Sequence, residues 1–132
     1  MRPEERELIR SIYDAMSRRD IAALRAQSAL SPDFEWRSAP EEPDVRVRRG
    51  PREAMAHSEE LLETFDRLDL SIEREIEAGR DRVIFEVRVN VRGAASGAAG
   101  ERREFRVWTF EGGRPVSLYE FSTLDDAMEG SG

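Results

Sequence analysis

Residues 83–91 carry the pattern that most restricts how this chain can fold. Apolar side chains recur there at every second position, as Val83, Phe85, Val87, Val89 and Val91. Successive side chains of a β-strand point to opposite faces of a sheet, so this period predicts a strand with one apolar face. A sheet with a buried side is therefore the element on which the rest of the chain has to pack.

Three other segments of the second half predict strands that complete an antiparallel sheet. Residues 68–79 alternate in the same way, and residues 103–110 and 115–122 form two shorter runs. Residues 93–100 are rich in Gly and Ala and predict a flexible hairpin connection. The Glu-Gly-Gly segment at 111–113 separates the last two strands, and its glycines permit the positive φ angles that a tight hairpin needs.

The first half of the chain predicts helices. Residues 3–18 and 51–66 carry apolar side chains at three- and four-residue spacing, which makes one apolar stripe on each helix. Asp20 is a candidate N-cap for a second, short helix with Ile21 and Leu24 pointing inward. Three helices are thus expected before the main strands.

The remaining segments are short or irregular. Residues 34–36 predict a short strand, residues 38–50 an exposed loop, and residues 125–128 a last helical turn before a frayed tail. Helices early and strands late predict an α+β fold with the helices on one face of the sheet. We expect a single domain over residues 1–132, ordered over about 1–127.

Composition excludes several functions. The net charge is -7 with acids and bases interspersed, so we expect neither nucleic acid nor membrane as a partner. All 21 basic residues are Arg, which excludes a Schiff-base lysine, and the absence of Cys excludes thiolate chemistry. With one His, no multi-histidine metal site forms, and we expect no metal and no cofactor. The N-terminus lacks a signal-peptide pattern, so we expect a cytoplasmic protein.

Four local phrases identify a family resemblance that covers nearly the whole chain. They are Ile12–Asp20, Pro32–Arg37, Arg49–Glu53 and Val107–Arg114. The chain resembles the SnoaL-like branch of the nuclear transport factor 2-like superfamily, which includes ketosteroid isomerases and polyketide cyclases. The resemblance implies a cone-shaped fold in which three helices pack on the concave face of a curved, mainly antiparallel sheet. It also implies one pocket for a small hydrophobic molecule and a homodimer formed through the sheet.

The same resemblance argues against steroid isomerisation. The general-base aspartate of ketosteroid isomerases falls on Trp36, and their proton-donating tyrosine falls on Ile12, with Tyr13 one step away. Their second acid falls on Arg106. Trp36 cannot transfer a proton and Ile12 cannot stabilise an oxyanion, so that mechanism is absent here.

Polyketide cyclases of the SnoaL type offer a second match. Their histidine on the penultimate strand falls on Arg106, and their aspartate on the last strand falls on Glu120. The second match depends on the hairpin register. A three-residue loop through Gly113 puts Arg106 on the same face as Leu118 and Glu120, whereas a two-residue Gly-Gly turn pairs Arg106 with Tyr119.

His57 completes the candidate site, because it falls where relatives place a large apolar pocket residue. Arg106 suits binding of an enolate or carboxylate oxygen, His57 suits acid–base chemistry, and Glu120 can orient either one. The candidate catalytic residues are therefore His57, Arg106 and Glu120. The candidate ligand-binding residues are Tyr13, Trp36, Val87, Val89, Trp108 and Leu118.

Plainer interpretations stay open at this point. Arg106 and Glu120 can form a buried ion pair without catalysis, and His57 can be structural. Three functions follow: an isomerase, cyclase or hydrolase acting on a hydrophobic carbonyl-containing metabolite; a non-catalytic binding module; or a dimerising module whose pocket is closed by side chains.

Overall fold

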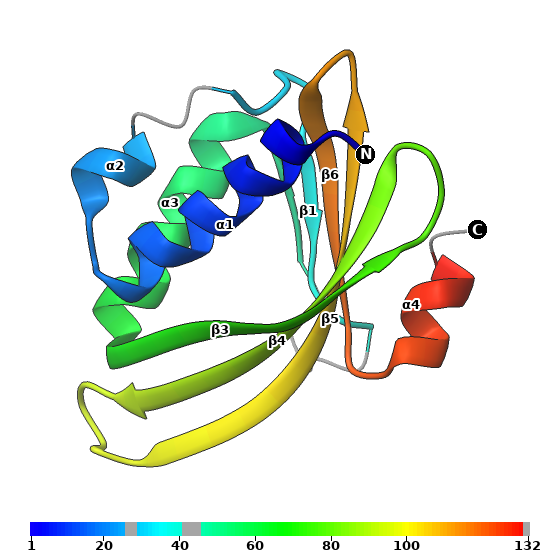
Figure 1. Cartoon of the computed structure of the whole chain (residues 1–132). Helices are drawn as coiled ribbons and strands as arrows, with labels where there is room; N and C mark the ends of the chain where they lie inside the picture. The colour runs from blue at the N-terminus through cyan, green and yellow to red at the C-terminus, as the bar shows by residue number, and fades with distance from the viewer. Residues whose placement is uncertain (26–28, 41–45, 131–132) are drawn as a thin grey trace.

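The structure, a computed structural model, describes residues 1–25, 29–40 and 46–130. Figure 1 shows the helices and strands in chain order. They are α1 (Pro3–Ser17), α2 (Ile21–Arg25), β1 (Glu35–Arg37), β2 (Val47–Arg49), α3 (Gly50–Thr64), β3 (Phe65–Glu77), β4 (Arg82–Gly93), β5 (Ala99–Glu111), β6 (Arg114–Phe121) and α4 (Leu124–Gly130). The predicted α+β class is confirmed.

One six-stranded sheet organises the molecule, in the order β2-β1-β6-β5-β4-β3. Every neighbouring pair is antiparallel except β1 with β6, which is parallel. Long strands β3, β4 and β5 curve strongly, and helices α1, α2 and α3 lie together on one side of them (Figure 1). The sheet is therefore curved and mainly antiparallel, as expected.

Alternation along the strands divides the buried residues between two faces. The larger apolar cluster lies between the helices and the inner face, and includes Ile9, Phe34 and Phe85. A smaller cluster on the outer face joins Phe105 and neighbouring strand residues to α4. Because side chains on a strand point alternately to its two faces, β5 can contribute to both clusters at once.

The hairpin between β5 and β6 combines the two registers considered from sequence. Gly112 and Gly113, with φ of 57° and 80°, form a two-residue turn that pairs Glu111 with Arg114. The register then shifts, because Phe110 pairs with Pro115 whereas Thr109 pairs with Ser117. Val116 is the extra residue of this β-bulge. Beyond the bulge, Arg106 pairs with Glu120, which is the register that a three-residue loop would give.

Several local predictions were wrong. The segment predicted as a loop at 38–50 contains strand β2, while its residues 41–45 lie outside the described residues. Ile21, predicted to point inward, is 39% exposed, although Leu24 of the same helix is buried. Asp20 does accept a hydrogen bond from the backbone N–H of Ala23, as expected of an N-cap.

Two features concern the ends of the chain. Helix α4 extends to Gly130, beyond the predicted last turn, and packs on the outer face of the sheet through Ala127. None of the helices in the described ranges combines the length and the apolar character needed to cross a lipid bilayer.

Candidate functional site

A cavity of about 760 Å³ lies between α1, α2 and α3 and the inner face of the sheet. Eight of the nine residues expected at a site line it: Tyr13, Trp36, His57, Val89, Arg106, Trp108, Leu118 and Glu120. Val87 is the exception, because it is completely buried in the core and does not reach the cavity. The elements that carry these residues come from both halves of the chain.

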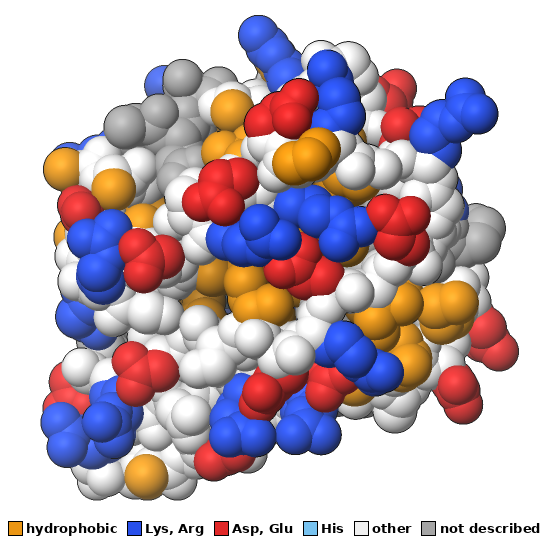
Figure 2. All heavy atoms as spheres, in the orientation of Figure 1, with side chains coloured by type: hydrophobic (Ala, Val, Ile, Leu, Met, Phe, Trp, Pro, Cys, Tyr) orange, Lys and Arg blue, Asp and Glu red, His pale blue; other side chains and the backbone are white. Residues whose placement is uncertain are grey.

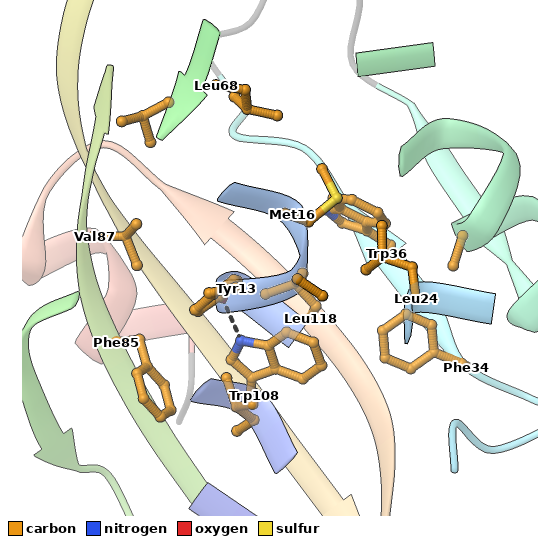
Figure 3. Packing of buried hydrophobic residues seen from close by; sticks show 14 of the residues in the cluster. Tyr13, Met16, Leu24, Phe34, Trp36, Leu68, Phe85, Val87, Trp108 and Leu118 are labelled. Carbon is orange, nitrogen blue, oxygen red and sulfur yellow. Dashed lines mark hydrogen bonds between the residues drawn. The ribbon is translucent and has the colours of Figure 1, made fainter. Parts of the chain in front are cut away.

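Aromatic side chains that line the cavity pack against one another in the core (Figure 3). The indole Nε1–H of Trp108 donates a hydrogen bond of 2.7 Å to the hydroxyl oxygen of Tyr13, and both side chains are buried. The two rings meet edge to face, and Phe34 packs against Trp108. This bond holds Tyr13 of α1 against β5.

Three charged side chains on β5 and β6 form what we call the polar cluster: Glu104, Arg106 and Glu120. Nε and Nη2 of Arg106 donate to Oε1 of Glu104, at 2.9 and 2.7 Å. Nη2 of Arg106 is also 3.5 Å from Oε2 of Glu120. Arg106 is buried on this wall of the cavity, so its charge requires nearby counter-charges.

Glu104 was missed by the sequence analysis. It precedes Arg106 by two positions on the same strand, which places both side chains on the same face. Its Oε2 is also 2.6 Å from Nη2 of Arg102, the next residue in that alternation. Every second side chain from Arg102 to Trp108 points to the same face of β5. Counting back two positions from Arg106 would therefore have placed Glu104 beside it.

Trp36 of β1 connects the polar cluster to His57 of α3. Its indole Nε1–H donates a hydrogen bond of 3.1 Å to Oε2 of Glu120. Its ring meets the imidazole of His57 edge to face, with 4.6 Å between centroids. His57 and Glu120, far apart in sequence, therefore lie on either side of one indole.

The three members of the polar cluster have different protonation tendencies. Burial raises the pKa of the Glu120 carboxyl, and Arg106 only partly opposes this effect. Burial would also raise the pKa of Glu104, but Arg106 and Arg102 outweigh it and hold that pKa below its usual range. Burial lowers the pKa of Arg106, but the negative charges of Glu104 and Glu120 together raise it by more, so Arg106 stays charged. Glu104 is thus the carboxylate of the cluster, and Glu120 is the group most ready to hold a proton.

His57 is shifted in the opposite direction. Burial, followed by the positive charge of Arg48, lowers the pKa of His57 from 6.5 to about 4. Its Nδ1 atom is buried without a hydrogen-bond partner in the described part of the chain, although Oε2 of Glu60 lies 3.6 Å away. His57 is therefore neutral near pH 7 and able to accept a proton.

The cavity has a polar wall and apolar surroundings. Strands β5 and β6 supply the polar cluster, whereas α1, α3 and β3 supply mainly hydrocarbon, including Met16, Leu61 and Leu70. Among the residues that the structure describes, no group of three or more His, Cys, Asp or Glu side chains is placed to hold a metal ion. Such a cavity suits an apolar ligand with oxygen atoms on one edge.

The family model described as the SnoaL-like domain matches residues 9–118 of this chain. Comparison of the sequence with curated proteins gave no significant match.

Solved structures with the same fold cover nearly the whole chain. An NTF2-like protein of unknown function from Burkholderia pseudomallei K96243 is 22% identical, with a TM-score of 0.75 and 97% of each chain covered. A putative SnoaL-like polyketide cyclase from Jannaschia sp. CCS1 is 18% identical, with a TM-score of 0.74, 97% of this chain and 93% of that chain covered. TerC, co-crystallized with polyporic acid, is 20% identical, with a TM-score of 0.72 and 95% of each chain covered.

Proposed function

Because the chain belongs to the SnoaL-like domain family, we propose that its cavity binds a hydrophobic carbonyl compound and moves a proton at the carbon next to that carbonyl. The observation that carries this proposal is the cavity itself, in which Arg106 and Glu120 on one wall face the mainly apolar side chains of α1, α3 and β3. The putative polyketide cyclase and the polyporic acid complex among the structural neighbours support a ring-containing ligand.

Three groups would receive the carbonyl oxygen. Arg106 presents a buried guanidinium, Tyr13 retains its hydroxyl hydrogen, and Glu120 holds a proton more readily than an ordinary carboxyl. Donors of this kind stabilise the negative charge that develops on oxygen when an enolate forms. They would take the part of the tyrosine and the second acid of ketosteroid isomerases, whose matching positions here are Ile12 and Arg106.

His57 would act as the base. Its neutral imidazole takes a proton from the carbon next to the carbonyl and becomes an imidazolium, while the electron pair moves onto the oxygen. This deprotonation is the step shared by isomerases and cyclases, and in an isomerisation the same proton then returns to that carbon or to another. The lowered pKa keeps His57 in the neutral form that this step requires.

One observation favours a non-catalytic binding module as the second candidate. Glu104 already pairs with Arg106 through two hydrogen bonds, so the polar cluster is partly satisfied without a ligand. A module whose pocket is closed by Trp36, Trp108 and Phe110 agrees less well with the structure, because a cavity of about 760 Å³ remains, lined by Trp36 and Trp108.

Hydrogen exchange at a carbonyl compound tests the proposal without knowledge of the natural substrate. We expect the protein to accelerate exchange of the α-hydrogens of 2-tetralone for deuterium in D₂O, followed by proton NMR. General bases typically contribute about 10²-fold or more, so His57→Ala should lose most of the acceleration. Glu63→Ala, an exposed position on the same helix, is the matched control.

Tryptophan fluorescence separates the two candidates, because Trp36 and Trp108 both line the cavity. Quenching by 2-tetralone together with His57-dependent exchange supports the enzyme. Quenching that is equal in wild type and His57→Ala, with no exchange above the buffer rate, supports the binding module. Absence of both signals over a panel of aromatic and alicyclic ketones counts against the proposed function.

A further inference from the structure

We propose that the cavity selects a hydrophobic acid, whose anionic oxygen binds beside Arg106 while Glu120 takes up a proton. This inference rests on the proposed function, since it names the chemical class of the ligand that the cavity receives. It is based on the counter-ions of Arg106 among the described residues, which compensate its buried charge only in part.

Arg106 is the buried cation that needs explanation. It is the one Arg among the described residues that is buried as a whole residue. Its closest counter-ion is Glu104, but the two oxygens of Glu104 are divided between Arg106, at 2.7 Å, and Arg102, at 2.6 Å. One carboxylate therefore serves two guanidinium groups, and Arg106 is only partly compensated by it.

Glu120 is the remaining candidate counter-ion, and its contact with Arg106 is loose. The 3.5 Å separation between Nη2 and Oε2 is an ion-pair distance without a hydrogen bond, and the hydrogen bond to Oε2 comes instead from Trp36. Glu120 and Arg106 both line the cavity, and Oε2 is the oxygen of Glu120 that the bond from Trp36 fixes. The carboxyl group is thus held by Trp36 through one oxygen and lies beside Arg106 in the lining of the cavity.

A ligand anion can take the place that Glu120 fills loosely. Placed beside Arg106, it supplies the missing counter-charge at close range in a water-poor cavity, where charge pairing is strongest. It would at the same time repel an ionised Glu120, so Glu120 takes up a proton and can donate it to the ligand oxygen in a hydrogen bond. The raised pKa of Glu120, caused first by burial, agrees with this exchange of roles.

The charged and titratable groups that face Glu120 come from four elements. They are Arg102, Glu104 and Arg106 of β5, Tyr13 of α1, His57 of α3 across the indole of Trp36, and Arg48 of β2. Burial lowers the pKa of His57 to about 4, whereas burial raises the pKa of Glu120. Proton uptake above pH 5 is therefore assigned to Glu120.

Two fluorescent naphthylamines that differ in charge provide the test. The probe 1-anilinonaphthalene-8-sulfonate is a hydrophobic anion whose sulfonate does not titrate in this range, and N-phenyl-1-naphthylamine is its neutral counterpart. We expect the anion to bind the intact protein at least tenfold more tightly at pH 6 than at pH 8, whereas the affinity of the neutral probe stays constant. Isothermal titration calorimetry in buffers of different ionisation enthalpy should show uptake of up to one proton with the anion.

Single substitutions identify which residue takes up the proton and which carboxylate competes with the anion for Arg106. Glu120→Gln should keep anion binding and lose both the proton uptake and the pH dependence. Glu104→Gln should strengthen anion binding about threefold to tenfold, because Arg106 loses its partial counter-ion. Glu86→Gln is the matched control, since Glu86 is a buried, ion-paired carboxylate on the outer face of the same sheet, and it should behave as wild type.

Each outcome decides between the inference and the proposed function. Equal, pH-independent binding of both probes overturns the inference but leaves a hydrophobic binding cavity. Uptake that persists in Glu120→Gln and disappears in His57→Gln overturns the assignment to Glu120. Binding of neither probe overturns the inference and the proposed function together. The measurements on the wild-type chain remain decisive even if one of these variants fails to fold.

Discussion

Tyr13 places a hydroxyl group in the centre of the molecule, where Trp108 donates a hydrogen bond to it. Tyr13→Phe would leave the Trp108 Nε1–H buried without an acceptor. We expect a loss of about 1–3 kcal/mol in the free energy of unfolding, measured by urea denaturation. Tyr119→Phe is the control, because the Tyr119 hydroxyl bonds to the half-buried Glu35 and its loss should cost less than about 1 kcal/mol. Equal losses for the two variants would contradict this view of the buried pair.

His57 gives the stability of the protein a pH dependence of known sign. Its pKa is about 4 in the folded state and 6.5 when unperturbed, so between these values the unfolded chain binds more protons. The contribution of His57 to stability is therefore fully present above pH 6.5 and is lost as the pH falls towards 4.

The comparison of wild type with His57→Gln isolates this contribution. Across pH 6.5 to 4, we expect wild type to lose about 2 kcal/mol relative to the variant, less than the whole shift implies because the ring keeps some contact with solvent. Urea denaturation of both proteins at several pH values is the measurement. Parallel profiles would show that the imidazole is not desolvated by folding.

At the level of single residues, the sequence predicted which side chains face the cavity better than it predicted the hydrogen bonds between them. Trp36, Arg106 and Glu120 were expected at the cavity and line it. The bond from Trp36 to Glu120 was not predictable, because it joins residues 84 positions apart. Val87 was expected to line the cavity and instead lies beneath it, since alternation identifies the inner face of a strand but not how deeply the helices cover it.

Among the elements, the β5–β6 hairpin depends most directly on glycine. Gly112 has φ of 57°, and an added Cβ there meets no atom within 4 Å, so backbone strain is the only penalty of a side chain. We expect Gly112→Ala to cost about 1 kcal/mol and Gly112→Asn clearly less, because Asn tolerates the left-handed region.

Thermal or urea unfolding of these variants, with Gly100→Ala as the control, tests the requirement. A Cβ at Gly100 would lie 3.6 Å from Val91 Cγ2, an ordinary contact, and the backbone there is not left-handed. Gly100→Ala should therefore be neutral or slightly stabilising. If Gly112→Ala and Gly100→Ala behave alike, the turn geometry is not what the φ angles indicate.

Periodicity explains which elements were predictable. Strand β4 was predicted within two residues because five apolar side chains repeat at period two. Strand β2 was missed because Val47–Arg49 is three residues long, charged and without alternation; its pairing with β1 comes from tertiary structure. The bulge at Val116 was not predictable, since its sequence fits an unbroken strand equally well, and only the packing of both faces selects the register.

At the scale of the whole molecule, charge is distributed as pairs. Figure 2 shows acidic and basic side chains alternating over one face, without a large area of one sign. On the outer face of the sheet, Glu86 lies between Arg74 and Arg103, at 2.9 and 3.3 Å. The apolar patch on that face is shared with α4.

We propose that two copies of the chain associate through this outer face, as the family resemblance implies. Light scattering coupled to size-exclusion chromatography should then give twice the 15.1 kDa of one chain. Arg103→Glu places a negative charge beside Glu86 and should shift the mass towards that of one chain. Glu63→Gln, on helix α3 at the opposite side of the sheet, should leave the mass unchanged. A mass of 15.1 kDa for wild type would contradict the proposal.

The two-residue turn and the bulge that follows it have an evolutionary consequence. Glu120 faces the cavity because the bulge at Val116 shifts the register of β6 by one residue, while Tyr119 and Phe121, its neighbours, point to the outer face. A deletion of Val116 would remove the bulge and leave Glu120 opposite Arg106, whereas closing the bulge without a deletion would bring Tyr119, an aromatic ring, opposite Arg106. A substitution at the turn that favours regular pairing over the bulge could thus change which side chain faces the pocket in descendants of this protein, without any substitution in the pocket itself.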